Sequence, residues 1–333
     1  MKKIYYFFGL IGILLVPLAA SAHVKWFVDA DTVTASEHAI TPFYTWTSTE
    51  VALWSVIVFV VVVLFGILDK KVVGLRWLVS FGSLHEEWVN RTAQILLGLF
   101  LVSVGILWKV LIIPDVPVVD GITKVLLGVQ LAIGGAFIFN IQPKIAAAAL
   151  MLFCGGLIFS NGIVTFLENA LLFSLALYFF IVYSDKDSAI AWLKDHAVEI
   201  VRIGTGISLI TLAFTEKLLF PELGLQFLEV HQWNFMQAIF PWFTNELFVL
   251  SVGFAEMIFG ILFVLGYITR ITTVLIALFF ATSVTVMLVQ FGQWEVEDLV
   301  VYAAAVILLV YGHGKTKFFH MPWATALSTK KYI

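Results

Sequence analysis

The sequence predicts an all-α membrane protein with about nine transmembrane helices that follow a signal peptide. Of its 333 residues, 61% are hydrophobic and 12% are charged, and the mean hydropathy is +1.02. A soluble domain carries about a quarter charged residues. The apolar residues occur as separate runs near bilayer-spanning length, and the basic residues are divided unevenly between the loops on either side. Composition, run length and charge distribution therefore indicate the same fold class.

The N-terminus has the three parts of a secretory signal. Two lysines follow Met1, an apolar run covers residues 4–18, and Ala20-Ser21-Ala22 closes the segment. This pattern predicts a signal peptide over residues 1–22 and a periplasmic lead over residues 23–48. The mature chain would begin with His23, whose amine and imidazole suit copper. No second ligand motif accompanies it, so the sequence assigns no metal site and leaves copper binding at His23 open.

Nine further apolar segments have helical length. The predicted spans are residues 50–68, 92–113, 122–140, 145–160, 168–184, 200–220, 246–266, 271–290 and 298–312. The first span and a cytoplasmic linker make up residues 49–90. The other eight spans form two groups of four, residues 91–187 and 188–316, and residues 317–333 form a cytoplasmic tail.

The distribution of basic residues gives the orientation. Of the 19 Lys and Arg residues, two belong to the signal peptide. If residue 23 lies outside, four more face the periplasm, and the remaining 13 (19 − 2 − 4) face the cytoplasm. The four outer ones are Lys25, Lys109, Lys124 and Lys217. This bias predicts a protein of the bacterial inner membrane with a periplasmic N-terminus and a cytoplasmic C-terminus.

The two groups of four spans share landmarks, which predicts an internal repeat. Arg91, Lys109 and Pro114 are followed 107–111 residues later by Arg202, Lys217 and Pro221, and Lys144 is followed 126 residues later by Arg270. The change in offset places an aromatic insertion at residues 222–245, which we expect at the membrane interface, covering a site between helices. Because each unit contributes an even number of spans, the two units would be parallel, with the span at residues 50–68 outside the repeat.

The second unit resembles the DoxX/DoxD-like family of membrane proteins. The residues that carry the resemblance are Arg202-Ile-Gly204, Glu216-Lys217, Glu256 with Gly260, Gly266-Tyr-Ile-Thr269-Arg270 and Tyr311-Gly312-His-Gly314-Lys315. Members of that family are four-helix membrane proteins. Some are subunits of thiosulfate:quinone oxidoreductase, and many have no settled activity. The resemblance therefore implies an accessory or subunit in membrane redox chemistry, with a quinone as cofactor and a soluble or membrane-bound redox protein as partner.

Glu256 is the first candidate catalytic residue. It is the eleventh of 21 residues in the predicted span 246–266, close to the bilayer midplane. An ionised carboxylate there costs about 3 kcal/mol on insertion scales, so it should be protonated, paired or next to water. It would serve as a proton relay or quinone contact, or as a hydrogen-bonded structural carboxyl. The offset of 126 places Gln130 at the same point of the first unit, which indicates that the second unit carries the chemistry.

Glu216 and Lys217 are the other candidate catalytic residues. Neighbours on a helix do not face each other, so we expect Lys217 to reach outward to solvent. For Glu216 two interpretations stay open: it turns inward toward Glu256 or the outer end of the last span, or it is a border charge that reaches solvent as Lys217 does. Three further acids, at positions 295, 297 and 298, precede the last predicted span. We expect them to cap that helix at its N-terminus, and attraction of cations is the alternative.

Composition excludes some classes of function and leaves three open. The net charge of −3 offers no basic surface for nucleic acid, and the single Cys154 excludes a cysteine-based metal site or an internal dithiol. The lipid bilayer is the expected partner. The open functions are a redox accessory, a small-solute or proton-coupled transporter, and an assembly factor without chemistry of its own. Most spans contain few polar residues and no break in the helix, which argues against a transporter. Whether the chain is an enzyme stays open.

Overall fold

The computed structural model describes residue 44 and residues 47–69, 86–113, 116–185, 190–292 and 294–314. Within these ranges the secondary-structure elements are helices joined by turns and loops, and an isolated bridge links Val110 and Pro117. The predicted signal peptide, nearly all of the periplasmic lead and the cytoplasmic tail lie outside the described residues. The prediction of an all-α fold is confirmed for the part of the chain described.

Helices occupy all nine segments that the sequence predicts as spans. The principal helices are α3 (Thr49–Leu68), α5 (Glu86–Ser103), α6 (Gly121–Phe139), α7 (Pro143–Glu168), α8 (Ala170–Val182), α9 (Ala197–Ala213), α10 (Pro221–His231), α11 (Asn245–Leu265), α12 (Thr269–Val286) and α13 (Leu299–Tyr311). Three of them continue into π-helical turns, which are η3 (Val104–Trp108) after α5, η5 (Phe214–Leu218) after α9 and η7 (Met287–Phe291) after α12. Two 3₁₀ segments, η4 (Ala191–His196) and η6 (Phe235–Ala238), lie in the connections.

Six of these helices are long and apolar enough to cross a membrane, which makes the chain a membrane protein. They are Thr49–Leu68, Glu86–Trp108, Gly121–Phe139, Trp192–Leu218, Asn245–Leu265 and Thr269–Gln290. A seventh span results if Asn161–Glu168 and Ala170–Val182, which meet at 70°, cross as one broken segment. Two apolar helices, Pro143–Gly156 and Leu299–Tyr311, are shorter. The 13 residues of α13 extend about 20 Å, less than the ~30 Å hydrocarbon core, so the count of nine spans stays a prediction.

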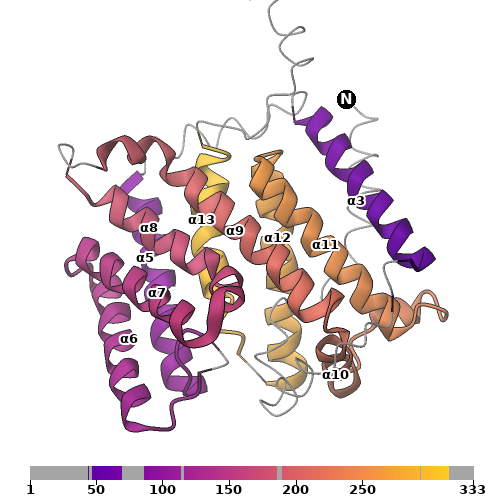
Figure 1. Ribbon diagram of the computed structural model, residues 1–333, viewed down its shortest axis with the longest axis horizontal. Helices are drawn as coiled ribbons and strands as arrows, with labels where there is room; N and C mark the ends of the chain where they lie inside the picture. Colours follow the sequence, from indigo (N-terminus) through magenta and orange to yellow (C-terminus); the bar gives the residue numbers. More distant parts are fainter. Residues whose placement is uncertain are drawn as a thin grey trace, which may run out of the picture.

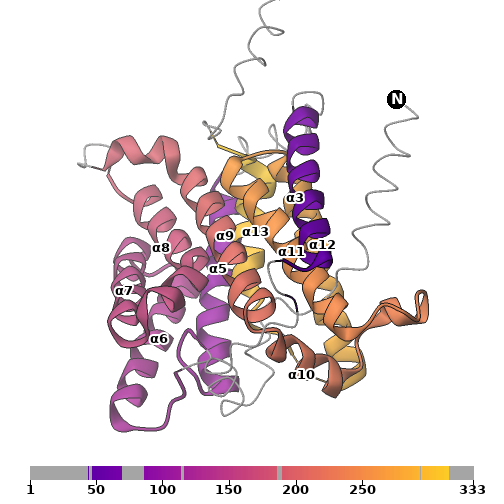
Figure 2. The same cartoon turned by 45° about the vertical axis from the view of Figure 1, so that its right-hand side comes forward.

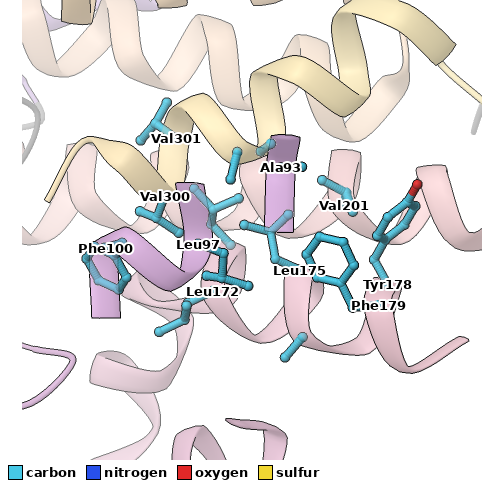
Figure 3. Packing of buried hydrophobic residues seen from close by; sticks show 14 of the residues in the cluster. Ala93, Leu97, Phe100, Leu172, Leu175, Tyr178, Phe179, Val201, Val300 and Val301 are labelled. Atoms are coloured by element: carbon cyan, nitrogen blue, oxygen red, sulfur yellow. The ribbon is translucent and has the colours of Figure 1, made fainter. Parts of the chain in front are cut away.

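The helices form two groups that meet along four of their members. Within the first group α5 packs on α6 and α7 on α8, and within the second α9 packs on α11 and α12 on α13. Between the groups, α8 packs on α9 and α5 on α13 (Figure 1). Figure 3 shows Leu97 of α5, Leu175 and Phe179 of α8 and Val300 of α13 in one buried cluster. The main core therefore lies where the two groups meet.

The C-terminal ends of α6 and α11 are built alike. Arg91 donates to the carbonyls of Phe137 and Ile138 at the end of α6, and Arg202 donates to those of Phe263 and Val264 at the end of α11. Carbonyls in the last turn of a helix lack the usual N–H four residues on. Although the N–H groups of Asn140 and Gly266 also donate to Phe137 and Phe263, one guanidinium reaches two carbonyls at once. Arg202 is thus buried, whereas the sequence counts it only as a loop cation that sets topology.

Glycines let the paired helices approach closely in each group. A Cβ atom built on Gly98 of α5 would lie 2.7 Å from the carbonyl oxygen of Gly134 on α6. A Cβ on Gly206 of α9 would lie 2.6 Å from that of Gly260 on α11. Small residues at such crossings are typical of membrane helix pairs.

α3 lies against the outer face of α11 (Figure 2). Val58 and Phe65 of α3 are buried in a cluster with Phe254 of α11. At the end of α3, the Asp69 carboxylate accepts a hydrogen bond of 2.8 Å from the backbone N–H of Ile268. The first predicted span therefore packs on the side of the bundle, outside the contact between the two groups.

Candidate functional site

Three charged side chains meet inside the second group of helices. Lys217 Nζ lies 3.1 Å from Glu256 Oε2 on α11 and 3.5 Å from Glu216 Oε2 on its own turn. The three residues are 3%, 4% and 1% exposed, respectively. The structure therefore brings together all three residues that the sequence proposes as catalytic, and we call them the Lys217 cluster.

The local backbone explains how neighbouring side chains share one site. α9 ends in the π turn η5, in which the Leu219 N–H donates to the Phe214 carbonyl five residues earlier. Such wide turns occur mainly as single insertions and frequently at functional sites. Opposite the turn, a Cβ on Gly253 of α11 would lie 3.1 Å from the Lys217 Cβ, so a glycine makes room for the lysine one turn before Glu256.

The expectation that Lys217 reaches outward to solvent is wrong. The lysine points into the bundle because η5 directs it at α11 and because two carboxylates offset the cost of burying its charge. The interpretation in which Glu216 turns inward toward Glu256 agrees with the geometry, with the lysine ammonium lying within reach of both carboxylates. Gly253 stands three residues before Glu256. It was the one feature of the sequence that could have indicated the contact between Lys217 and Glu256.

The Lys217 cluster holds two acids and one base. Both carboxylates lie within 3.5 Å of the ammonium, so these three side chains taken by themselves, when fully ionised, carry one net negative charge. Buried charges are stable only when paired and hydrogen-bonded. Glu256 Oε1 is buried and has no hydrogen-bond partner among the described residues. This oxygen is the atom of the cluster at which a proton would bind.

Two small voids flank the cluster. One lies beside Glu256, between α9, α11 and α12, and its lining residues are Leu209, Val252, Ala255, Glu256, Phe259, Ile276, Phe279 and Phe280. The other lies beside Lys217, under α10, with the lining residues Lys217, Gly224, Phe227, Leu228, Phe248, Val249 and Val252. Each has space for about one water molecule. A quinone ring does not fit beside Glu256 in this arrangement, because the void there has only the volume of about one water molecule.

α10 covers the outer side of the site, as the sequence predicts for the aromatic insertion. Leu223 and Phe227 of α10 are buried against Phe248 and Val249 of α11. Beyond α10 the chain projects from the bundle (Figure 2), and Trp242 is 66% exposed there. The insertion thus combines a packed lid with an exposed aromatic tip.

The first group has no charged counterpart of the Lys217 cluster among its described residues. Gln130 is fully buried in α6 and donates a hydrogen bond of 2.8 Å from Nε2 to the Leu101 carbonyl of α5. Lys109, which the sequence pairs with Lys217, is exposed and ends η3 in a left-handed conformation. The neutral side-chain amide of Gln130 thus hydrogen-bonds to the neighbouring helix α5 without forming an ion pair.

Three acids near the start of α13 are also buried. Glu295, Glu297 and Asp298 are at most 6% exposed, and Ser283 of α12 donates a hydrogen bond of 3.0 Å to Glu295. Asp298 stands at the N-cap position of α13, and its side chain makes no capping hydrogen bond. Burial raises the pKa of Glu295 to about 7 and that of Glu297 to about 8. Among the described residues no group of acids, histidines and cysteines is arranged to hold a metal ion.

Comparisons with protein-family models, with curated proteins and with solved structures give no match for this chain. Its functional assignment therefore rests on its own residues and their geometry.

Proposed function

We propose that this chain is a DoxX-like protein of the bacterial inner membrane that binds and releases a proton at the Lys217 cluster. In this proposal it serves as the proton-handling accessory of a membrane redox system. The observation that carries the proposal is the pairing of two buried carboxylates with one ammonium in membrane-spanning helices. Ionisable residues inside the membrane are costly and mark ion pathways and proton relays. The link to redox chemistry rests on the family resemblance.

The two groups of helices are, in this proposal, parallel repeats related by an axis along the membrane normal, and the chain has nine spans. The similar construction of the helix ends supports the repeat. At an offset of 126 residues, Phe137 and Ile138 correspond to Phe263 and Val264, and the Ile141-to-Ala136 backbone bond corresponds to the Tyr267-to-Leu262 bond. The excess of basic residues on one side supports a periplasmic N-terminus after signal-peptide cleavage.

The Lys217 cluster itself needs no cofactor for this role. In this proposal Glu256 Oε1 takes the proton, and Lys217 holds the two carboxylates in place. A quinone, if one is used, must bind away from Glu256. The chain's own part is to exclude bulk water, fix the carboxylates and exchange the proton.

The redox role can be tested in native membranes supplied with a reduced sulfur compound, the substrate class that the resemblance implies. We expect Glu256→Gln to lower the number of protons moved per electron while electron flow continues. Glu229→Gln, which changes an exposed acid on α10, is the matched control and should leave the ratio unchanged. An unaltered ratio in Glu256→Gln would remove the proton-handling role.

A proton-coupled transporter is the second candidate. The sequence interpretation counts few broken spans, but the structure has a non-helical Gly162 in α7, a 70° bend before α8 and π turns at the ends of three helices. Interrupted helices are typical of transporter binding sites. The test is charge movement in proteoliposomes across a panel of small solutes. A solute-dependent current that Glu256→Gln abolishes would favour transport over the redox role.

A further inference from the structure

The described residues close the Lys217 cluster off from solution. Lys217, Glu216 and Glu256 are buried, and each of the two voids beside them has the volume of about one water molecule. Proton exchange at the cluster therefore needs a movement that opens one of the voids. The two voids have different walls, and the walls indicate which one can open.

The void beside Glu256 is walled by helices long enough to cross the membrane, which are α9, α11 and α12. One turn after Glu256, α11 crosses α9 at close range, since a Cβ on Gly260 would lie 2.8 Å from the Gly206 carbonyl oxygen. Membrane helices associate through such small-residue contacts. Opening this void would therefore mean separating two closely packed spans.

The void beside Lys217 is covered by the short helix α10. Its 11 residues extend about 16 Å, too short to cross the hydrocarbon core. α10 packs mainly on α11 and on the π turn η5. The apolar cluster that holds it, which includes Phe227 of α10 and Phe248 of α11, is separate from the main core. α10 can thus move away from Lys217 while the spans stay packed.

The backbone at both ends of α10 is non-helical. Phe220, directly before the helix, has φ −123° and ψ 67°, and Gln232, directly after it, has the left-handed values φ 49° and ψ 42°. Beyond Gln232 the chain is fastened, because Asn234 Nδ2 donates hydrogen bonds of 2.9 Å to the Phe243 carbonyl and to Asn245 Oδ1. Hinges in proteins are a few residues at the ends of elements. Two such junctions allow α10 to tilt as a rigid body without leaving the protein.

We propose that α10 is a movable lid, and that its tilting away from α11 opens the void beside Lys217 as the entrance to the cluster. In the orientation proposed above, this entrance faces the periplasm. Water that enters there can deliver a proton to a carboxylate of the cluster and take it away again. The identity of the entering species rests on the proposed function, whereas the movement of α10 does not.

A disulfide can lock the lid. A Cβ on Gly224 of α10 would lie 3.5 Å from the Val249 Cβ of α11, within the range of disulfide bonds. The double variant Gly224→Cys/Val249→Cys should therefore form this bond on oxidation. The native Cys154 is buried in α7, in the other group of helices. Unchanged thermal unfolding of the reduced double variant will show that the fold is kept.

The first test measures the movement by thiol labelling of the full chain in lipid nanodiscs. Val252→Cys places a thiol in the wall of both voids. We expect a water-soluble thiol reagent to label it, and at least about tenfold more slowly once the lock has formed, because a buried thiol reacts only during local opening. Val201→Cys, at an equally buried valine of the main core, is the matched control.

The control should react slowly with and without the lock, and the unaltered chain gives the background from Cys154. Two results would overturn the movable lid. One is labelling at position 252 that is as fast in the locked as in the unlocked chain. The other is labelling at position 252 that is as slow as at position 201.

The second test follows proton entry after a pH jump, with the double variant Gly224→Cys/Val249→Cys in nanodiscs. The infrared carboxyl band that depends on Glu256 should respond at least about tenfold more slowly in the oxidised form and recover on reduction. An equally fast response in both forms would mean that Glu256 exchanges a proton by another route, and would overturn the entrance. If the band responds in neither form, the proposed function fails and the proton entrance with it, while thiol labelling still decides whether α10 moves.

Discussion

Replacing Lys217 by methionine removes the cation that lies between Glu216 and Glu256. Methionine keeps much of the length and the apolar stem of lysine, so packing against Gly253 is retained. The variant leaves two carboxylates, each at most 4% exposed, facing each other in the bundle. The expected result is a large loss of stability at neutral pH that shrinks as the pH falls, because protons then take the place of the cation.

The size of the effect follows from the geometry. At 3.1 Å the attraction between Lys217 Nζ and Glu256 Oε2 is about 5 kcal/mol at an effective dielectric constant of ~20. Removing one partner of a buried ion pair typically costs about 3–5 kcal/mol. Some of this is recovered by protonation of a carboxyl group, so we expect Lys217→Met to lower the free energy of unfolding by about 3 kcal/mol. In the double variant Lys217→Met/Glu256→Gln, the free energy of unfolding should be higher than in Lys217→Met by at least about 1 kcal/mol.

The assay is reversible unfolding in mixed micelles, followed by tryptophan fluorescence. Lys124→Met is the matched control, since Lys124 is exposed and its loss should change stability by less than about 0.5 kcal/mol. The reasoning fails if Lys217→Met costs no more than Lys124→Met. It also fails if the effects of Lys217→Met and Glu256→Gln simply add, because the two side chains would then not interact.

Two further predictions concern packing and pH. A Cβ on Gly260 would lie 2.8 Å from the Gly206 carbonyl oxygen, so Gly260→Ala should cost about 1–3 kcal/mol in the same unfolding assay. Gly155→Ala, where a Cβ meets no atom within 4 Å, should cost nothing measurable. The raised pKa values of Glu295 and Glu297 mean that the folded chain binds more protons than the unfolded chain above about pH 4.5. Their contribution to stability is therefore present below pH 4.5 and is lost as the pH rises through 7 to 8. Glu297→Gln should flatten this slope in a pH series of unfolding measurements, and an unchanged slope would show that Glu297 is ionised in the folded protein.

The helices and the depth of Glu256 were predictable because both depend on local order in the sequence. Apolar runs near twenty residues long determine the spans, and the position of a residue within its run determines its depth in the membrane. These rules place Glu256 in the middle of α11.

The contacts that complete the site were not predictable, because they depend on backbone irregularities and on distant partners. The π turn η5, and not an ordinary helix, directs Lys217 at Glu256. Arg202 binds carbonyls about sixty residues away, which a charge count along the sequence cannot reveal. The burial of Glu295 depends on packing against α12 and on the hydrogen bond from Ser283. In each case the residue itself stands out in the sequence, but the group that it contacts is evident only in the folded structure.

The most direct test of the central claim is infrared difference spectroscopy of the protein in lipid nanodiscs, with and without quinone analogues. The account predicts a carboxyl band that responds to pH, disappears in Glu256→Gln and persists in Glu229→Gln. A shift of that band with a quinone analogue would connect the proton site to redox chemistry. If no carboxyl band that depends on Glu256 responds to pH, and Glu256→Gln folds normally, then Glu256 is a structural residue and the Lys217 cluster does not exchange a proton.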